Sequence, residues 1–280
     1  MKRSRNLLLL AAMLTSTFSA TAETKTVEAA HKRGVIDTSK SPYAKLRSIP
    51  MQDTQLTEGF WAERFELCAD HMIPAMKKAM LGKGSAKLNR IKFMAGLTDT
   101  NPGGTPWGDG DNYKWIETMA HAYNLNKDPA LDRQMDEWIE IVGKAQEPDG
   151  YISTNIGHDK EARFKQVNLH EMYNMGHLLT AGCIHYRVTG KETFLNIARK
   201  SADFLCRQWK ENPEQMARFP WNPSVYMGMA EIYRTTGNPG YLELLRKMID
   251  NRGSRPNPDR DHRFGGTDQT QDRVPIRKET

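Results

Sequence analysis

The stretch Tyr186-Arg187-Val188-Thr189-Gly190 occurs again, slightly altered, as Tyr233-Arg234-Thr235-Thr236-Gly237, 47 residues further along the chain. Each copy ends a largely apolar segment, and glycine is favoured just after a helix because it adopts the left-handed backbone conformation at low cost. A weaker copy begins at Tyr123 and has the turn Asn126-Lys127-Asp128-Pro129. A period of about 40–50 residues is typical of helical-hairpin arrays. The sequence therefore predicts stacked αα-hairpins.

Two kinds of helix alternate outward from this repeat. Residues 113–126, 168–188 and 221–235 are apolar around most of the circumference, which predicts buried inner helices, and Gly176 and Gly182 would let neighbours approach the second of these closely. Amphipathic segments lie between them and predict outer helices; their apolar stripes are Leu131, Met135, Trp138 and Val142, and then Phe194, Ala198, Ala202, Leu205 and Trp209.

This alternation predicts an all-α fold with an inner and an outer layer, either an open solenoid or a closed α/α toroid. Long loops at 82–112 and 147–167 favour the toroid, because solenoid turns are short and uniform. We expect about seven helices in this chain. A toroid of six hairpins has twelve, so the sequence predicts an incomplete toroid, roughly half of one.

The N-terminus has the pattern of a cleavable signal peptide over residues 1–22. Lys2, Arg3 and Arg5 precede a short apolar run at 7–14, and Ala20-Thr21-Ala22 fits a cleavage site. We therefore expect an exported protein, periplasmic or secreted, with no membrane span. Residues 23–58 are polar and aperiodic, as in a linker or extended lead-in, and residues 59–280 would form the helical domain.

Charge and cysteine usage exclude some functions. The formal net charge of +6 includes three basic residues of the signal peptide, and lysine and arginine do not cluster with aromatic residues, which argues against a nucleic-acid partner. Cys68, Cys183 and Cys206 lie in apolar helical contexts, so we expect free, buried thiols rather than disulfides. The absence of a Cys-x-x-Cys pair leaves no self-contained zinc signature.

Four clusters carry candidate site residues. In the first, Trp107 to Asn112 with Trp115 and Glu117, the carboxylates either cap a helix or, as Asp109 or Asp111, bind sugar hydroxyls beside the rings of Trp107 and Trp115. In the second, Gln146 to Tyr151, Pro-Asp-Gly predicts a turn, and Tyr151 would face a cleft or simply end a loop.

The third cluster lies on a predicted inner helix, where His170, Asn174 and His177 share one face. They line a water- or sugar-filled cavity, or they are buried and satisfied by protein partners. In the fourth cluster, Trp221 and Asn222 would lie at the mouth of an inner helix, a suitable place to stack on a sugar ring. The predicted substrate-binding set is His170, Trp115, Asp111, Trp221 and Asn174.

Glycosidases usually need two carboxyl groups flanking the scissile bond. Sequence spacing pairs none of the candidates, which are Asp109, Asp111, Glu117, Asp149 and Glu171.

Several motifs, in this order and spacing, resemble glycoside hydrolase family 127. They are Gly59 to Arg64, Lys114-Trp115-Ile116-Glu117, Ala145 to Tyr151, and His170-Glu171-Met172-Tyr173-Asn174-Met175-Gly176-His177. The resemblance implies a catalytic α/α toroid followed by β-sandwich domains, and a retaining exo-hydrolase acting on the β-L-arabinofuranosides of plant-type glycans. It also implies that His170 contacts the sugar.

The resemblance further implies a zinc-bound Cys thiolate as nucleophile, with a separate Glu as acid/base. The family motifs that look like Glu-Thr-Cys and Cys-Cys-Pro-Pro-Asn do not occur in this sequence. We therefore assign no catalytic residue and no metal ligand here. We expect this chain to be catalytically incomplete and to bind no cofactor itself, with zinc in the complete enzyme. The family often has His-Pro near Trp221-Asn222, and this departure allows another pentose or a branched acidic sugar.

Two other functions fit the residues. One is a different toroid glycosidase, of the unsaturated uronyl hydrolase type, which would use a close pair of the carboxylates named above. The other is a non-catalytic helical module that binds sugar.

Overall fold

The computed structural model describes residues 42–46, 48–49, 53–82, 86–217, 219 and 222–250, and this part of the chain is helical and free of strands. The predicted signal peptide, most of residues 23–52, Trp221 and residues 251–280 lie outside the described residues. The α-helices are α2 (Phe60–Glu66), α3 (Ile73–Leu81), α4 (Lys87–Met94), α5 (Gly108–Asn126), α6 (Pro129–Ala145), α7 (Glu171–Thr189), α8 (Thr193–Glu211), α9 (Pro213–Met216), α10 (Ser224–Thr236) and α11 (Pro239–Asp250).

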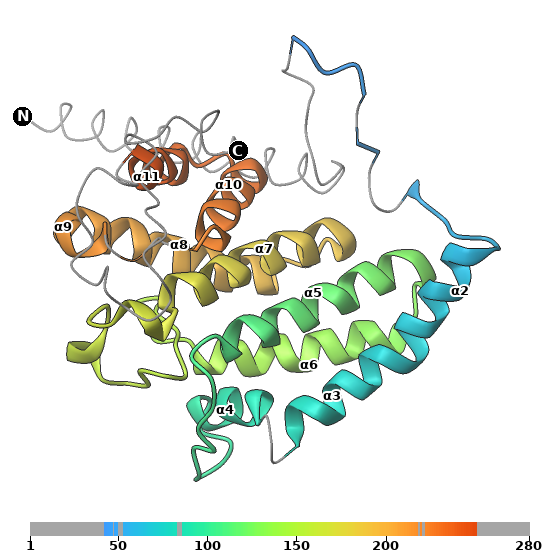
Figure 1. Cartoon of the computed structure of the whole chain (residues 1–280), viewed down its shortest axis with the longest axis horizontal. Helices are drawn as coiled ribbons and strands as arrows, with labels where there is room; N and C mark the ends of the chain where they lie inside the picture. Colours follow the sequence, from blue (N-terminus) through green and yellow to red (C-terminus); the bar gives the residue numbers. More distant parts are fainter. Residues whose placement is uncertain are drawn as a thin grey trace, which may run out of the picture.

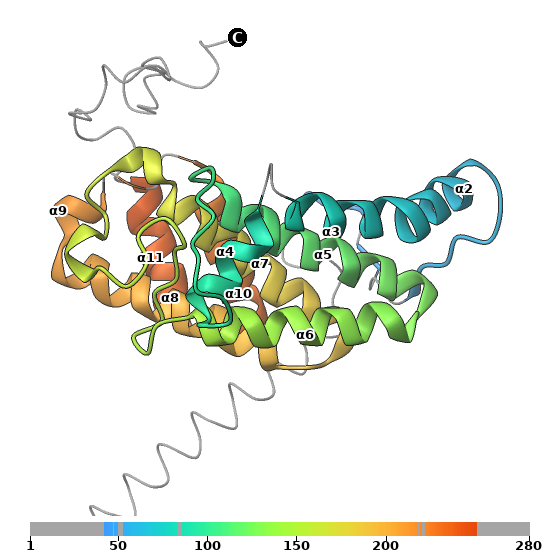
Figure 2. The ribbon, with the colours of Figure 1, turned by 90° about the horizontal axis from the view of Figure 1, so that it is seen from below.

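Consecutive helices pair as hairpins, as the sequence predicts. Figure 1 shows α5, α7 and α10 side by side, and α7 packs against both of the others. Helices α6, α8 and α11 each return along the preceding inner helix, and Figure 2 shows α5 and α6 in separate layers. The predicted inner and outer helices are thus confirmed.

The repeated Tyr-to-Gly stretch ends the inner helices in one way. The residue after each helix is left-handed, with φ of 53° at Lys127, 75° at Gly190 and 74° at Gly237. Its N–H donates to the carbonyl of the tyrosine four residues earlier, at 2.7–2.8 Å. This bond satisfies a carbonyl that the helix end would otherwise leave unpaired. The weaker copy at Tyr123 is therefore a true structural repeat.

Glycines allow the backbones of α7 and α10 to touch. A Cβ added at Gly176 would lie 2.4 Å from the backbone of Ser224 and Val225, and one at Gly228 would lie 2.5 Å from the Gly176 carbonyl oxygen. A Cβ at Gly182 would lie 2.8 Å from Ala198 on α8. The close approach predicted at Gly176 and Gly182 is confirmed, and any side chain at these positions would force the helices apart.

The loops differ from prediction in one place. Residues 82–112 are not all loop, because they contain the two-turn helix α4 and the start of α5 at Gly108. The 147–167 loop is confirmed, with two short 3-10 turns at Lys160–Ala162 and Val167–Leu169. Before α4, a π-helical stretch, Leu67–Met72, joins α2 and α3 into one run. Counting that run once, the described chain has seven long helices, as expected, besides short α4 and α9.

The cysteines are free, as predicted, although only Cys183 is fully buried and Cys68 and Cys206 are partly exposed. Among the described helices, none combines the length and the apolar character needed to cross a bilayer.

Candidate functional site

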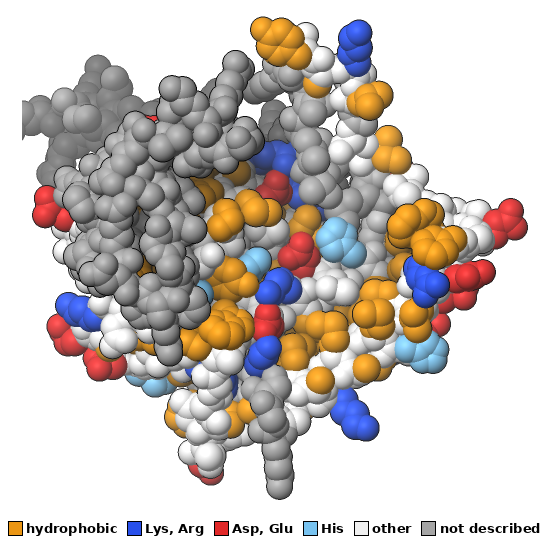
Figure 3. Space-filling view, viewed as in Figure 1, with side chains coloured by type: hydrophobic (Ala, Val, Ile, Leu, Met, Phe, Trp, Pro, Cys, Tyr) orange, Lys and Arg blue, Asp and Glu red, His pale blue; other side chains and the backbone are white. Residues whose placement is uncertain are grey.

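Charged and aromatic side chains meet at the first turns of α5 and α7. Asp111 pairs with Lys87 of α4 and, at 2.7 Å, with Lys114 one turn further along α5. Lys114 also donates to the Tyr173 hydroxyl of α7 at 3.2 Å. Partial burial opposes ionisation of Asp111, but the two lysines outweigh it and lower the pKa of this carboxyl. Figure 3 shows lysine, acidic and histidine side chains along the middle of this face, with hydrophobic side chains beside them.

Trp107 and His170 form the aromatic part of this site. Their ring centroids are 5.5 Å apart, edge to face, and His170 meets Tyr173 at the same distance. Tyr173 also contacts His177, with ring centroids 4.6 Å apart. Trp107 is 40% exposed, so part of its surface is open to solvent. We call these four side chains, Trp107, His170, Tyr173 and His177, the aromatic cluster.

The histidines of the cluster are held in the neutral state. Partial burial lowers the pKa of His170, and burial together with the charge of Lys114 lowers the pKa of His177. The Asn222 amide nitrogen lies 3.4 Å from Nδ1 of His170. If this amide donates to Nδ1, the imidazole proton resides on Nε2. A neutral imidazole of that tautomer donates one hydrogen bond to a hydroxyl.

Trp115 does not belong to this site. Its side chain is fully buried, and its ring packs edge to face on Trp138 of α6, with centroids 5.9 Å apart. Its indole N–H donates to the Ile73 carbonyl at 3.3 Å. The prediction that Trp115 offers a ring face to a sugar is therefore wrong. Its indole lies on the side of α5 that packs on the outer layer.

Asn174 is also committed to the fold. Its side-chain oxygen accepts the Gly110 N–H at 2.9 Å, and its amide nitrogen donates to the Pro106 carbonyl at 2.8 Å. The residue is 1% exposed. Its predicted role in binding substrate is contradicted, because both ends of the amide bind backbone. The His170 and Asp111 predictions remain untested by these contacts, and Trp221 lies outside the described residues.

The shared face predicted for His170, Asn174 and His177 rests on a helix beginning at 168. The helix begins at Glu171 instead, after a 3-10 turn and a left-handed His170 with φ of 57°. His170 therefore departs from helical register. The residue that joins the two histidines is Tyr173, which sequence reasoning missed. Its spacing of three residues from His170 and four from His177 is the signal that would have found it.

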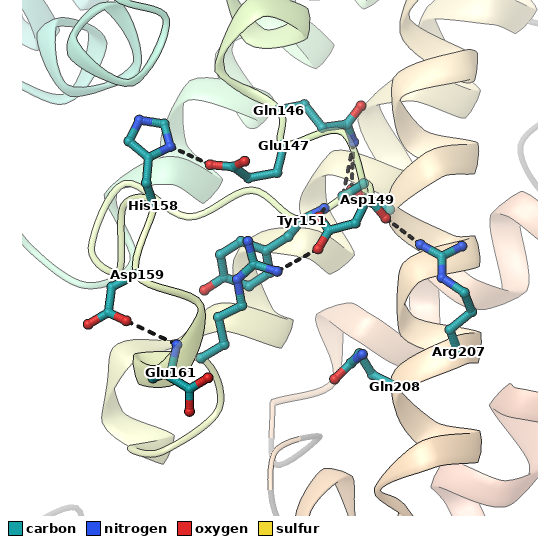
Figure 4. Close-up of polar contacts among 12 residues, drawn as sticks. Gln146, Glu147, Asp149, Tyr151, His158, Asp159, Glu161, Arg207 and Gln208 are labelled. Atoms are coloured by element: carbon teal, nitrogen blue, oxygen red, sulfur yellow. Dashed lines mark hydrogen bonds and ion pairs between the residues drawn. The ribbon is translucent and has the colours of Figure 1, made fainter.

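The turn at 146–151 is a structural anchor on α8 (Figure 4). Gln146 donates to the carbonyls of Gly150 and Ile197 and to the Ser201 hydroxyl, at 2.9–3.1 Å. Gly150 has φ of 95°, and an added Cβ would lie 2.1 Å from the Lys200 carbonyl oxygen. Asp149 accepts from the Tyr151 N–H and pairs with Arg163 at 2.7 Å. These contacts fix where Tyr151 enters the core, where it is fully buried rather than facing a cleft.

Each candidate carboxylate has its own partner. Buried Asp109 accepts from the backbone and hydroxyl of Thr154, at 2.8 and 2.5 Å, and burial raises its pKa. Glu171 accepts from the Tyr151 hydroxyl at 2.5 Å and from the Phe164 N–H. Glu117 lies 3.8 Å from His121. This arrangement gives no support to the uronyl hydrolase alternative, which needs two carboxylates turned to one bond.

The described residues do not fit a zinc–thiolate centre. In the part of the chain that the structure describes, no three His, Cys, Asp or Glu side chains lie close enough to hold a metal ion. Cys183 is buried among core side chains, and burial raises the pKa of its thiol to about 12. A thiol in such surroundings is neutral and inert. The zinc implied for the complete enzyme stays a prediction.

Comparison with known proteins decides the family. The model of the β-L-arabinofuranosidase GH127 catalytic domain matches residues 53–280. The chain belongs to glycoside hydrolase family 127. Among curated GH127-like proteins, the non-reducing end β-L-arabinofuranosidase of Bifidobacterium longum subsp. longum is 33% identical over 190 residues, which are 65% of this chain and 29% of that protein.

Solved structures agree with this GH127 assignment. A GH127 β-L-arabinofuranosidase from Geobacillus stearothermophilus T6 matches with a TM-score of 0.67 and 29% identity, covering 75% of this chain and 35% of that one. A second GH127 β-arabinofuranosidase gives 0.64 and 30%, covering 74% and 34%. The predicted all-α, α/α-toroid fold and the predicted membership of a glycoside hydrolase family are thereby confirmed. The chain spans about a third of the length of these relatives.

Proposed function

We propose that this chain supplies the sugar-binding face of a β-L-arabinofuranosidase, with Trp107 and His170 as the residues that contact the sugar. The observation that carries the proposal is the pair itself, a half-exposed indole in edge contact with a neutral imidazole on the inner helical layer. An indole offers apolar surface to the C–H groups of a sugar ring, and an imidazole N–H donates to a hydroxyl. Family membership and the names of the relatives support arabinofuranoside as the substrate.

Asp111 has a supporting part in this proposal. Its carboxylate is ionised and held between Lys87 and Lys114, so it can accept from a sugar hydroxyl without becoming protonated. We further propose that the protein is exported, on the pattern of residues 1–22, which places it where plant-type glycans are encountered. Zinc at a Cys thiolate elsewhere in the complete enzyme remains part of the proposal.

Sugar binding by the purified chain tests the proposal. Saturation-transfer NMR with methyl β-L-arabinofuranoside should show binding to the purified chain. Trp107→Ala should raise the Kd measured in this way about tenfold, because the variant loses most of the stacking surface. The matched control is His158→Ala, which removes an imidazole that is 68% exposed on the 147–167 loop and should leave Kd unchanged. The absence of saturation transfer to this glycoside from the folded chain would refute the proposal.

A further inference from the structure

Two residues in a rare backbone conformation flank one buried carboxylate. Phe164 has φ of 51° and His170 has φ of 57°. Residues other than glycine seldom occupy this left-handed region, and a bulky aromatic does so only when its surroundings enforce it. Phe164 donates its N–H to both oxygens of Glu171, at 3.1 and 3.0 Å, and Glu171 directly follows His170 in the chain.

The Glu171 carboxylate also accepts from a second residue, Tyr151. The Tyr151 hydroxyl donates to it at 2.5 Å, and both residues are at most 1% exposed. The Arg163 guanidinium lies 4.0 Å from the centre of the Tyr151 ring and pairs with Asp149 in the turn that leads to Tyr151. A chain of contacts therefore runs from the 146–151 turn, through Tyr151 and Glu171, to the backbone on either side of the 165–169 segment.

We propose that Glu171 is a positioning residue, which through its bonds to Tyr151 and Phe164 holds His170 in its left-handed conformation against Trp107. The inference rests on the proposed sugar-binding role of His170. Glu171 touches no sugar in this account, because its carboxylate is buried and is bound by Tyr151 and Phe164. Its chemistry suits the task because an ionised carboxylate accepts strong, charge-assisted bonds at both oxygens, whereas protonation removes the charge and makes one oxygen a donor.

The charge state of Glu171 gives the proposal a pH dependence. The charged or titratable groups that act on its carboxylate are Tyr151, which donates to it, and Arg163, whose positive charge opposes the effect of burial. Burial raises the pKa of Glu171 to about 7. Acidification through neutrality therefore weakens the bonds that Glu171 accepts from Phe164 and Tyr151, and the position of His170 should change in that range.

Tyr151→Phe and Glu171→Gln test the inference, with the His170 imidazole observed by heteronuclear NMR and assigned with His170→Ala. The matched control is Tyr241→Phe. Tyr241 is 3% exposed and donates to the carboxylate of Asp203, an exposed residue, at 2.8 Å between α11 and α8, so the control also removes a bond from a buried tyrosine to a carboxylate. Both test variants should shift the His170 signals and weaken the Kd for methyl β-L-arabinofuranoside about 3- to 10-fold. Tyr241→Phe should lower the melting temperature and leave the His170 signals and the Kd unchanged.

Two further results decide the matter. In the unsubstituted chain the His170 signals should show an inflection near pH 7 that Glu171→Gln abolishes. Unchanged His170 signals in folded Tyr151→Phe, or the same shift in Tyr241→Phe, would overturn the positioning role even if sugar binding holds. If the unsubstituted chain binds no arabinofuranoside, the proposed function fails, while the His170 signals still decide whether Glu171 positions this residue.

Discussion

The side-chain oxygen of Asn174 accepts the Gly110 N–H at 2.9 Å, so the first turn of α7 caps the first turn of α5. The bond links two neighbouring inner helices at the end that carries the aromatic cluster. Gly110 allows it, because a Cβ there would lie 3.1 Å from that oxygen and 3.2 Å from the His177 ring. The site is therefore assembled where the N-terminal ends of two inner helices meet.

Asn174→Ala should destabilise the chain by about 2–4 kcal/mol, because the Gly110 N–H and the Pro106 carbonyl both lose a buried partner. Urea unfolding measures the free energy of unfolding. Asn196→Ala, at an exposed position on α8, is the control and should change it by less than about 0.5 kcal/mol. If Asn174→Ala kept its stability but no longer bound sugar, Asn174 would be a sugar-binding residue after all.

The two tryptophans of α5 and its N-terminal turn should respond in opposite ways. Trp115→Ala should cost about 3–5 kcal/mol of stability, because it leaves a cavity between α5 and α6. Trp107→Ala should cost less, about 1–3 kcal/mol, because Trp107 is already 40% exposed to solvent. Thermal unfolding of both variants checks this, and equal losses would show that Trp107 is a core residue.

Gly150→Ala should prevent stable folding of the 147–167 loop, since its Cβ would lie 2.1 Å from the Lys200 carbonyl oxygen at a φ of 95°. Gly157→Ala is the control. It also has a positive φ, 66°, but its Cβ would meet only Met94, at 3.9 Å, so it should cost about 1–2 kcal/mol. Melting temperatures compare the two, and similar values would mean that the turn moves away from α8 without penalty.

His185 should make the fold sensitive to acid. It is fully buried, neither ring nitrogen has a hydrogen-bond partner among the described residues, and burial lowers its pKa to about 4. Between pH 6.5 and 4, His185 is protonated in the unfolded chain but not in the folded chain. The free energy of unfolding therefore falls as the pH falls, by about 3 kcal/mol in all. His185→Leu should remove this loss.

Chemical denaturation at pH 7.5, 5.5 and 4.5 measures the effect as a difference from the unsubstituted chain. The difference is needed because Glu171, whose pKa is raised, contributes over much of this range with the opposite sign. His71→Gln, at an exposed position, should keep the acid sensitivity of the unsubstituted chain. If His185→Leu keeps it too, His185 is not its source.

Sequence periodicity was sufficient for the long helices and their layers. In a long helix, apolar residues recur at every turn on the side that is buried, so the sequence shows which side that is. The repeated left-handed residues Gly190 and Gly237 mark where two of the inner helices end. Two-turn α4 was missed because eight residues carry too few apolar positions to show a period. The fold class can thus be predicted from local sequence, because the pattern of apolar residues in each helix shows how much of that helix is buried.

The site was predicted less well. Whether a side chain is free to bind a ligand depends on its contacts with residues that are distant in the sequence. Trp107 and Trp115 look alike in the sequence, yet only Trp115 lies under α6. Asn174 has the residue type of a sugar ligand, but Pro106 and Gly110 occupy it. His170 is left-handed, and the carboxylate of the adjacent Glu171 is bound by the hydroxyl of Tyr151, 20 residues earlier, a contact that local sequence pattern does not reveal.

Main-chain contact between α7 and α10 at Gly176 and Gly228 has a consequence for how the molecule can diversify. At that crossing no side chain separates the two helices. The distance between α7 and α10 is therefore set by their peptide groups, whose size does not change when neighbouring residues are substituted. Changes in the shape of the site must then come from residues at the N-terminal ends of the helices, where the aromatic cluster lies. To move α7 and α10 further apart, an engineer would start with Gly176→Ala or Gly228→Ala, because each places a methyl group between the two backbones.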